Sequence, residues 1–81
     1  MYEELRQAES VVAGTKQTVR ALREELVSIV YMADDADKAV KDEVFAAVGE
    51  QDVHILYVPS KAELGLECGI DVPCACAAVL R

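Results

Sequence analysis

The chain has 81 residues, fifteen of them acidic and eight basic, and its net charge of −7 argues against binding nucleic acid over the whole surface. A hydrophobic content of 53% excludes a disordered chain, and no apolar run reaches the roughly 18–20 residues of a membrane span. The first ten residues are polar and acidic, unlike a signal peptide. We expect one domain over residues 1–81, located in the cytoplasm, where thiols stay reduced.

The first predicted elements are a polar helix over residues 2–9, a strand over 11–13 and a helix over 16–25. Gly14 separates the strand from the second helix, and Thr15 is the expected N-cap, because its hydroxyl can accept from a helix-start amide. The side of this helix that should face the core is marked by apolar residues at helical spacing: Val19, Leu22 and Leu26.

The nearly continuous apolar runs 28–33 and 53–58 predict two strands buried on both faces. Between them, apolar residues at helical spacing predict a helix over 40–48 that ends near Gly49. Ser60 and Glu63 form a capping box that starts another helix, which ends at Cys68–Gly69. Residues 74–80 then form a last strand of small residues.

The alternation of strands and helices predicts an α/β fold, a three-layer α/β/α sandwich with a mixed sheet of about four strands. Two strand–helix–strand units, over 28–58 and 53–80, favour parallel neighbours joined by right-handed crossovers. In open α/β sheets, binding sites gather at the loops of one edge.

The segment GTKQTVRALR, residues 14–23, is basic in an acidic chain. Residues 10–23 carry a charge of +3, so the rest carries −10. A helix start here would turn the amides of Lys16, Gln17 and Thr18 toward an anion, with Lys16, Arg20 and Arg23 on one side. An ordinary solvated basic side is the alternative. The spacing excludes a nucleotide-binding P-loop.

No catalytic constellation is present, and we expect a protein without catalytic residues, metal, cofactor or small-molecule substrate. The three cysteines are expected to act as small buried hydrophobes, with a metal site and redox chemistry as alternatives: Cys68, Cys74 and Cys76. His54 is isolated and is expected to be structural or to lie at a strand end. The acidic residues after position 33 lack the pattern of a calcium loop.

The short stretch IDVP places the apolar residues Ile70 and Val72 around Asp71 in a predicted loop that Pro73 stiffens. Apolar residues on such a loop can cover an unstacked nucleobase. The alternative is that they turn inward and close the end of the core.

Five stretches in this order resemble one family: GTKQTVRAL, MADDAD, VPSKAELG, CGIDVP and the last strand. The chain is similar, from about Leu5 to Leu80, to the kink-turn RNA-binding ribosomal proteins of the L-seven-Ae type, especially their short bacterial members. The resemblance implies an α/β/α sandwich that binds kink-turns, which are sharply bent RNA helices with tandem sheared G·A pairs.

The resemblance also implies roles for individual residues. The residues implied to read the G·A pairs are Gly14, Thr15, Lys16, Gln17 and Arg20. Those implied to surround the flipped-out nucleotide are Asp37, Lys41 and Lys61, with Lys41 at a usually aliphatic position. Those implied to cover the bulge are Ile70, Asp71, Val72, Pro73 and Cys74, with Asp71 and Val72 where a basic residue is frequent.

We therefore expect a non-catalytic, ribosomal-protein-like monomer whose partner is structured RNA, such as ribosomal RNA or a riboswitch, with no membrane partner. The alternative is a protein-interaction module on the same fold that has lost strong RNA binding, which the acidic surface would suit.

Overall fold

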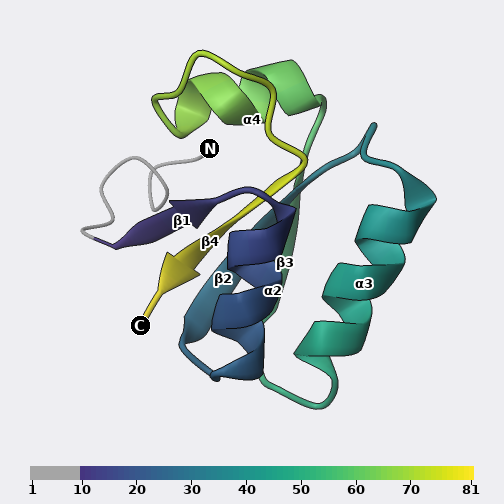
Figure 1. Cartoon of the computed structure of the whole chain (residues 1–81), viewed down its shortest axis with the longest axis vertical. Helices are drawn as coiled ribbons and strands as arrows, with labels where there is room; N and C mark the ends of the chain where they lie inside the picture. The colour runs from purple at the N-terminus through teal and green to yellow at the C-terminus, as the bar shows by residue number, and fades with distance from the viewer. Residues whose placement is uncertain (1–9) are drawn as a thin grey trace.

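The computed structural model describes residues 10–81, as four strands and three helices (Figure 1). In chain order the elements are β1 (Val11–Ala13), α2 (Thr15–Arg23), β2 (Val27–Ala33), α3 (Lys38–Val48), β3 (His54–Val58), α4 (Lys61–Glu67) and β4 (Cys76–Leu80). The helix predicted over residues 2–9 lies outside the described residues.

The four strands form one mixed sheet in the order β1-β4-β2-β3. Strands β2 and β3 are parallel, with Ile29 opposite His54 and Ala33 opposite Val58. Strand β4 runs antiparallel to both of its neighbours, β1 and β2. The predicted α/β class and the mixed four-stranded sheet are therefore confirmed, as is a parallel pair from the unit 28–58.

The unit 53–80 does not give parallel neighbours, so that prediction is wrong. Helix α4 has seven residues and is about 10 Å long, too short to return along the sheet. It lies instead across the end at which β2 and β3 finish (Figure 1). The chain therefore enters β4 from that same end, and β4 runs against β2.

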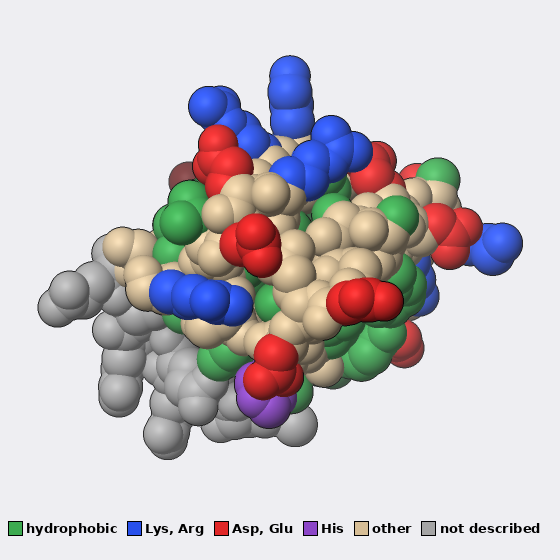
Figure 2. Space-filling view, turned by 90° about the horizontal axis from the view of Figure 1, so that it is seen from below, with side chains coloured by type: hydrophobic (Ala, Val, Ile, Leu, Met, Phe, Trp, Pro, Cys, Tyr) green, Lys and Arg blue, Asp and Glu red, His purple; other side chains and the backbone are tan. Residues whose placement is uncertain are grey.

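The opposite end of the sheet carries the loops that follow α2 and α3. Four exposed acidic residues lie in these loops: Glu24, Glu25, Glu50 and Asp52. Figure 2 views the molecule from this side and shows acidic side chains spread over it, while Lys and Arg gather mainly along one border. This end of the sheet lacks the predicted binding residues, and its exposed loops are acidic.

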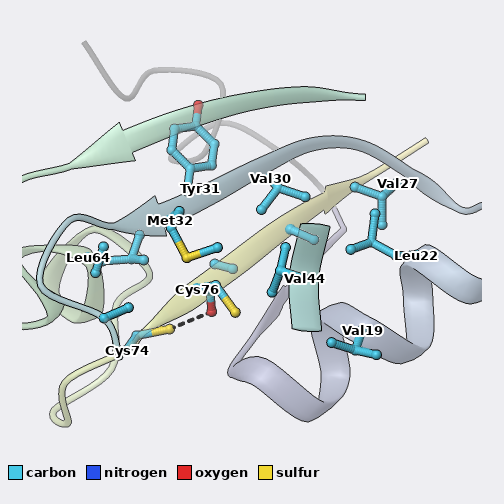
Figure 3. Packing of buried hydrophobic residues seen from close by; sticks show 14 of the residues in the cluster. Val19, Leu22, Val27, Val30, Tyr31, Met32, Val44, Leu64, Cys74 and Cys76 are labelled. Atoms are coloured by element: carbon cyan, nitrogen blue, oxygen red, sulfur yellow. Dashed lines mark hydrogen bonds between the residues drawn. The ribbon is translucent and has the colours of Figure 1, made fainter. Parts of the chain in front are cut away.

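The core lies mainly between the sheet and the paired helices α2 and α3, which cover one face (Figure 1). Val30 and Met32 of β2 point toward these helices, and Tyr31 points to the other face (Figure 3). Leu22 of α2 and Val44 of α3 are fully buried there. Fully burying such a side chain stabilises the fold by about 1.5–3 kcal/mol.

Two predictions of burial are wrong. Strand β3 was expected to be buried on both faces, yet Leu56 is 41% and Tyr57 50% exposed, because β3 is the edge strand beyond β2. Leu26 was expected on the inner side of a helix reaching residue 25. Helix α2 ends at Arg23, and Leu26 is 46% exposed in the following loop.

Other local predictions are confirmed. The Ser60 hydroxyl accepts from the Glu63 amide at 3.1 Å, as in a capping box, and α3 ends at Gly49. Cys74 and Cys76 are buried as small core residues, as predicted, whereas Cys68 is only partly buried, and the last strand begins at Cys76, two residues later than predicted. His54 is the exposed first residue of β3, the predicted strand-end position.

Candidate nucleic-acid interface

The topology brings the predicted binding segments together at one end of the sheet. The Gly14 amide donates to the Cys76 carbonyl at 2.8 Å, which joins the start of α2 to β4. The Ala33 amide donates to the Ala75 carbonyl at 2.8 Å, and the Asp34 amide donates to the Val58 carbonyl at 2.7 Å. We call this region the site edge and define it by four segments: residues 14–17, 34–37, 60–61 and 70–75.

Helix α2 begins one residue earlier than predicted, and Thr15 is not its N-cap. Gly14 is the N-cap, with a φ of 100° that a side-chain-bearing residue rarely adopts. The Thr18 amide donates to the Gly14 carbonyl at 3.0 Å, so the unpaired helix-start amides are those of residues 15–17 rather than 16–18. The Thr15 hydroxyl instead accepts from the Cys76 thiol at 3.7 Å.

The outer side of α2 is basic and exposed, as predicted. Lys16, Arg20 and Arg23 are exposed, whereas Val19 and Leu22 are buried against the sheet. Arg20 approaches Glu24 at 4.0 Å, but both side chains are largely exposed, so this ion pair contributes little and leaves the guanidinium accessible. Gln17 is exposed beside Lys16 at the helix tip.

The turn before α3 connects the next group of predicted residues. Asp37 is the N-cap of α3, yet its side chain makes no capping hydrogen bond, and the residue is exposed. Lys41 Nζ donates to the Asp34 carbonyl at 2.8 Å. The Lys61 amide donates to Asp35 Oδ1 at 2.8 Å. Asp37, Lys41 and Lys61 are thus held around one turn. Asp35, which lies in the MADDAD stretch but received no role in the predicted site, fixes the position of Lys61.

The loop before β4 folds back onto α4. The Ile70 amide donates to Gly65 O at 3.0 Å, and the Cys74 amide donates to Lys61 O at 2.9 Å. Gly65 allows this approach, because a β-carbon there would overlap the Val72 carbonyl oxygen. The sequence alone did not show that Gly65, in the middle of a predicted helix, is a contact point for the loop.

The two readings of the apolar loop residues are both partly correct. Val72 is 61% exposed and free to cover a ligand, whereas Ile70 packs partly against the core. Between the loop and α4 lies an open, mainly apolar groove of about 300 Å³. It is lined by Ala62, Leu66, Ile70, Asp71, Val72 and Pro73.

The site edge is not uniformly basic. The start of α2 contributes Lys16 without a neighbouring acid, but the turn before α3 carries three aspartates and the loop carries the exposed Asp71. No group of three metal-ligating side chains occurs within residues 10–81. The groups that this surface offers to a ligand are therefore helix-start amides, lysine side chains, an amide side chain and an apolar loop.

Comparison with known proteins identifies the family. The sequence pattern of the ribosomal protein L7Ae/L30e/S12e/Gadd45 family matches residues 1–81. The chain belongs to this family. As a member of this family the protein is non-catalytic, as the sequence predicted. It also has the α/β architecture of the family.

Similar full-length relatives are bacterial. An "RNA-binding protein" of Geobacillus thermodenitrificans is 45% identical over 80 residues, which cover 99% of this chain and 98% of that one. "RNA-binding protein YbxF" of Geobacillus stearothermophilus is 44% identical over the same shares of the two chains. An "RNA-binding protein" of Bacillus pumilus is 42% identical over 98% of this chain and 96% of its own.

Two solved structures share the fold of this L7Ae-family protein. A 15.5-kDa RNA-binding protein of Giardia lamblia aligns with a TM-score of 0.78 and 20% identity, covering 98% of this chain and 67% of that one. A protein of unknown function from Bacillus halodurans aligns with a TM-score of 0.81 and 21% identity, covering 95% and 77%. Among the described helices, none is long and apolar enough to cross a membrane.

Proposed function

We propose that this family member binds structured RNA at the site edge and recognises a kink-turn. The observation that carries the proposal is the start of α2, where the three unpaired main-chain amides of residues 15–17 lie beside the exposed side chains of Lys16 and Gln17. Relatives that match nearly the whole chain at 42–45% identity bear the name RNA-binding protein, which supports RNA as the ligand. The kink-turn is the RNA that the quoted motifs imply.

The start of α2 would provide most of the recognition. Its amides and Lys16 suit a phosphate or another acceptor, because the positive end of the helix dipole adds to the lysine charge. Gln17 can donate and accept at the same time and so can pair with the edge of a G in a sheared G·A pair. Arg20, one turn further along the exposed side, adds a contact to the RNA backbone.

The turn before α3 would hold the flipped-out nucleotide. The Asp37 carboxylate is not used for capping and can accept from a base or a ribose hydroxyl. Lys61 lies beside this turn because Asp35 binds its amide, and Lys41 is tied to the same turn through Asp34. Both lysines can then neutralise the backbone of the sharply bent strand.

The loop of residues 70–73 would cover the bulge. Val72 is exposed enough to lie on a nucleobase, and Pro73 stiffens the loop beneath it. Ile70 supports the loop from the core side, and Cys74, which is 3% exposed, supports it from below rather than contacting RNA. The negative charge of Asp71 in this loop would repel the phosphates of the RNA and weaken binding.

The test is a titration with a kink-turn stem and with a plain duplex of the same length at several salt concentrations. We expect selective binding of the kink-turn with an affinity that falls as salt rises. Lys16→Glu should weaken that binding by about 10–100-fold. Arg81→Glu makes the same charge change at the opposite end of the sheet, where Arg81 contacts Val27 O, and should leave selectivity intact.

Equal binding of both RNAs, or unchanged selectivity in Lys16→Glu, would contradict the proposal. Absence of RNA binding would favour the protein-interaction module instead. Size-exclusion chromatography of the complex tests the further expectation that the protein acts as a monomer, which should appear as one protein per RNA stem.

A further inference from the structure

Strand β3 lies at one edge of the sheet, with β2 on its inner side. Within residues 10–81 no strand pairs with its outer edge. An edge strand carries a row of unpaired amides and carbonyls, and proteins usually protect such a strand with a lysine, a proline or a bulge. The five residues of β3, HILYV, include no lysine, arginine, acid or proline, and their register with β2 is regular. This edge is therefore open to another strand.

One hydrogen bond shows in which direction the backbone groups of β3 point. The Asp34 amide donates to the Val58 carbonyl at 2.7 Å, so Val58 turns its backbone groups toward β2. In a strand the amide and the carbonyl of one residue point to the same side, and those of the next residue point to the other side. Ile55 and Tyr57 therefore direct their amides and carbonyls away from β2, and these two residues offer four hydrogen-bonding groups to a partner strand.

The side chains at this edge are apolar on both faces of the sheet. Leu56 is 41% and Tyr57 50% exposed. Leu56 lies opposite Tyr31, which points away from helices α2 and α3 (Figure 3). Tyr57 lies opposite Met32, which points toward these helices. A strand that pairs with β3 would therefore have an apolar neighbour on each face.

We propose that two copies of this protein associate through β3, antiparallel and related by a two-fold axis at Leu56, so that their two sheets join into one. In this pairing Ile55 lies opposite Tyr57 of the second copy, and the two residues exchange both of their backbone hydrogen bonds. The same exchange occurs on the other side of the axis. Leu56 lies opposite Leu56 of the second copy, in a pair without hydrogen bonds, where side chains come closest.

Two features favour a second copy as the partner of this edge. The pairs of Ile55 with Tyr57 place an aromatic ring beside a β-branched side chain, a combination that stabilises cross-strand contacts. Beyond the strands, the same register sets the exposed Asp52 opposite Ser60 of the second copy and next to its Lys61. Each copy thus offers the other an acid for its lysine. The short contact and the net charge of −7 on each copy make the dimer weak and reversible.

Association would also affect RNA binding, a consequence that rests on the proposed function. Antiparallel pairing puts the loop before β3 of one copy, with Asp52, beside the site edge of the other. A carboxylate there would repel phosphate and occupy Lys61. RNA should therefore bind the single chain and release it from the dimer, in agreement with one protein per RNA stem. The association itself does not require RNA, so its test is carried out without RNA and is independent of the titration described above.

Sedimentation equilibrium of the full-length, reduced protein tests the association. Between about 5 μM and about 1 mM, the average mass should rise from that of one chain toward twice that value, because a weak dimer follows mass action. One chain has a mass of 8.8 kDa. A mass that stays at one chain over the whole range would overturn the proposal.

Leu56→Lys locates the contact on β3. It removes the central apolar pair and places two like charges directly opposite each other, so the dimer should be weakened about tenfold or more. Leu66→Lys is the matched control, because Leu66 is 75% exposed on α4 and away from this edge. It should leave association unchanged, and circular dichroism should show that both variants are folded. Equal weakening by both variants would contradict an interface on β3.

Cysteine cross-linking tests the register. Opposite residues without hydrogen bonds between them have Cα atoms about 4.5 Å apart in antiparallel strands, which suits a disulfide. In a Cys68→Ser background, Leu56→Cys treated with oxidised glutathione should give a covalent dimer that a dithiol separates. His54→Cys in the same background should give far less, because His54 would face Val58 of the second copy. Equal cross-linking of the two variants, or none in Leu56→Cys, would overturn the two-fold pairing.

Discussion

The main-chain amide of Lys61 donates to the Asp35 carboxylate at 2.8 Å, and this bond joins the first residue of α4 to the turn before α3. Asp35→Ala removes the acceptor and leaves a helix-start amide without a protein partner. We expect the free energy of unfolding to fall by about 1 kcal/mol, since the bond is exposed and water can replace part of it. Urea denaturation followed by circular dichroism measures this loss.

Asp35→Asn is the matched control, because it keeps a side-chain oxygen at the same position and removes only the charge. Its loss should be about half of that in Asp35→Ala. Equal stability of the alanine variant and the parent would show that the bond does not hold α4 in place.

Gly65 lies against the backbone of Val72, and a methyl group at this position has no room. Gly65→Ala should lower the free energy of unfolding by about 1–3 kcal/mol, because the loop must move away from α4. This is opposite to the effect usual inside a helix, where alanine is more stable than glycine by about 1 kcal/mol. Thermal unfolding gives the sign directly.

Gly69→Ala separates crowding from backbone strain, because Gly69 has a positive φ but open space around it. It should lower stability by about 1 kcal/mol and leave the loop on α4, which backbone amide exchange at Ile70 and Cys74 can report. A stabilised Gly65→Ala variant would contradict the close approach.

Local patterns predicted most elements because each one depends on neighbours in the sequence. The capping box at Ser60 and the basic outer side of α2 are read from residues three or four positions apart. The segments of the site were implied by the family resemblance instead, and the structure brings them to loops at one end of the sheet, where binding sites gather in α/β folds.

The remaining features depend on residues far apart in the chain. The exposure of Leu56 and Tyr57 follows from the position of β3 at the edge of the sheet, and an apolar run reads the same in an edge strand as in a central one. The contact of Asp35 with Lys61 spans 26 residues, and an aspartate in an acidic turn resembles a simple cap. In the sequence, Gly65 cannot be distinguished from a glycine that only weakens a helix, because its close contact is with the backbone of Val72 in the loop.

Asp71 is the exposed carboxylate of the loop proposed to cover RNA. Asp71→Asn removes a negative charge next to the RNA backbone and should raise kink-turn affinity about two- to fivefold at low salt, with a smaller effect at high salt. Filter binding or fluorescence anisotropy at two salt concentrations measures both effects. Glu50→Gln makes the same charge change at the opposite end of the sheet and should have little effect, whereas equal gains in both variants would place Asp71 outside the interface.

The ionisation of the Cys74 thiol makes the free energy of unfolding depend on pH. In the folded state the pKa of Cys74 lies at about 6, below its ordinary value of 9.0, because the Cys68 thiol donates to it. Between these values the unfolded chain binds more protons than the folded one at this residue, so stability rises with pH and is lost as pH falls through 6. The pKa values of Cys68 and Cys76 are raised in the folded state, so these two residues lower stability as pH rises above 9.

Urea denaturation of the reduced protein at several values between pH 6 and pH 9 tests this, with Cys74→Ser as the comparison. The stability difference between the parent and the variant should grow over this range, because the serine hydroxyl does not ionise. Cys68→Ala provides the second comparison: without the donating thiol, the pKa of Cys74 should move back toward its ordinary value, and the rise should shift to higher pH. A difference between the parent and Cys74→Ser that stays constant across the range would show that Cys74 is protonated in the folded protein, held by its bond to the Cys76 carbonyl.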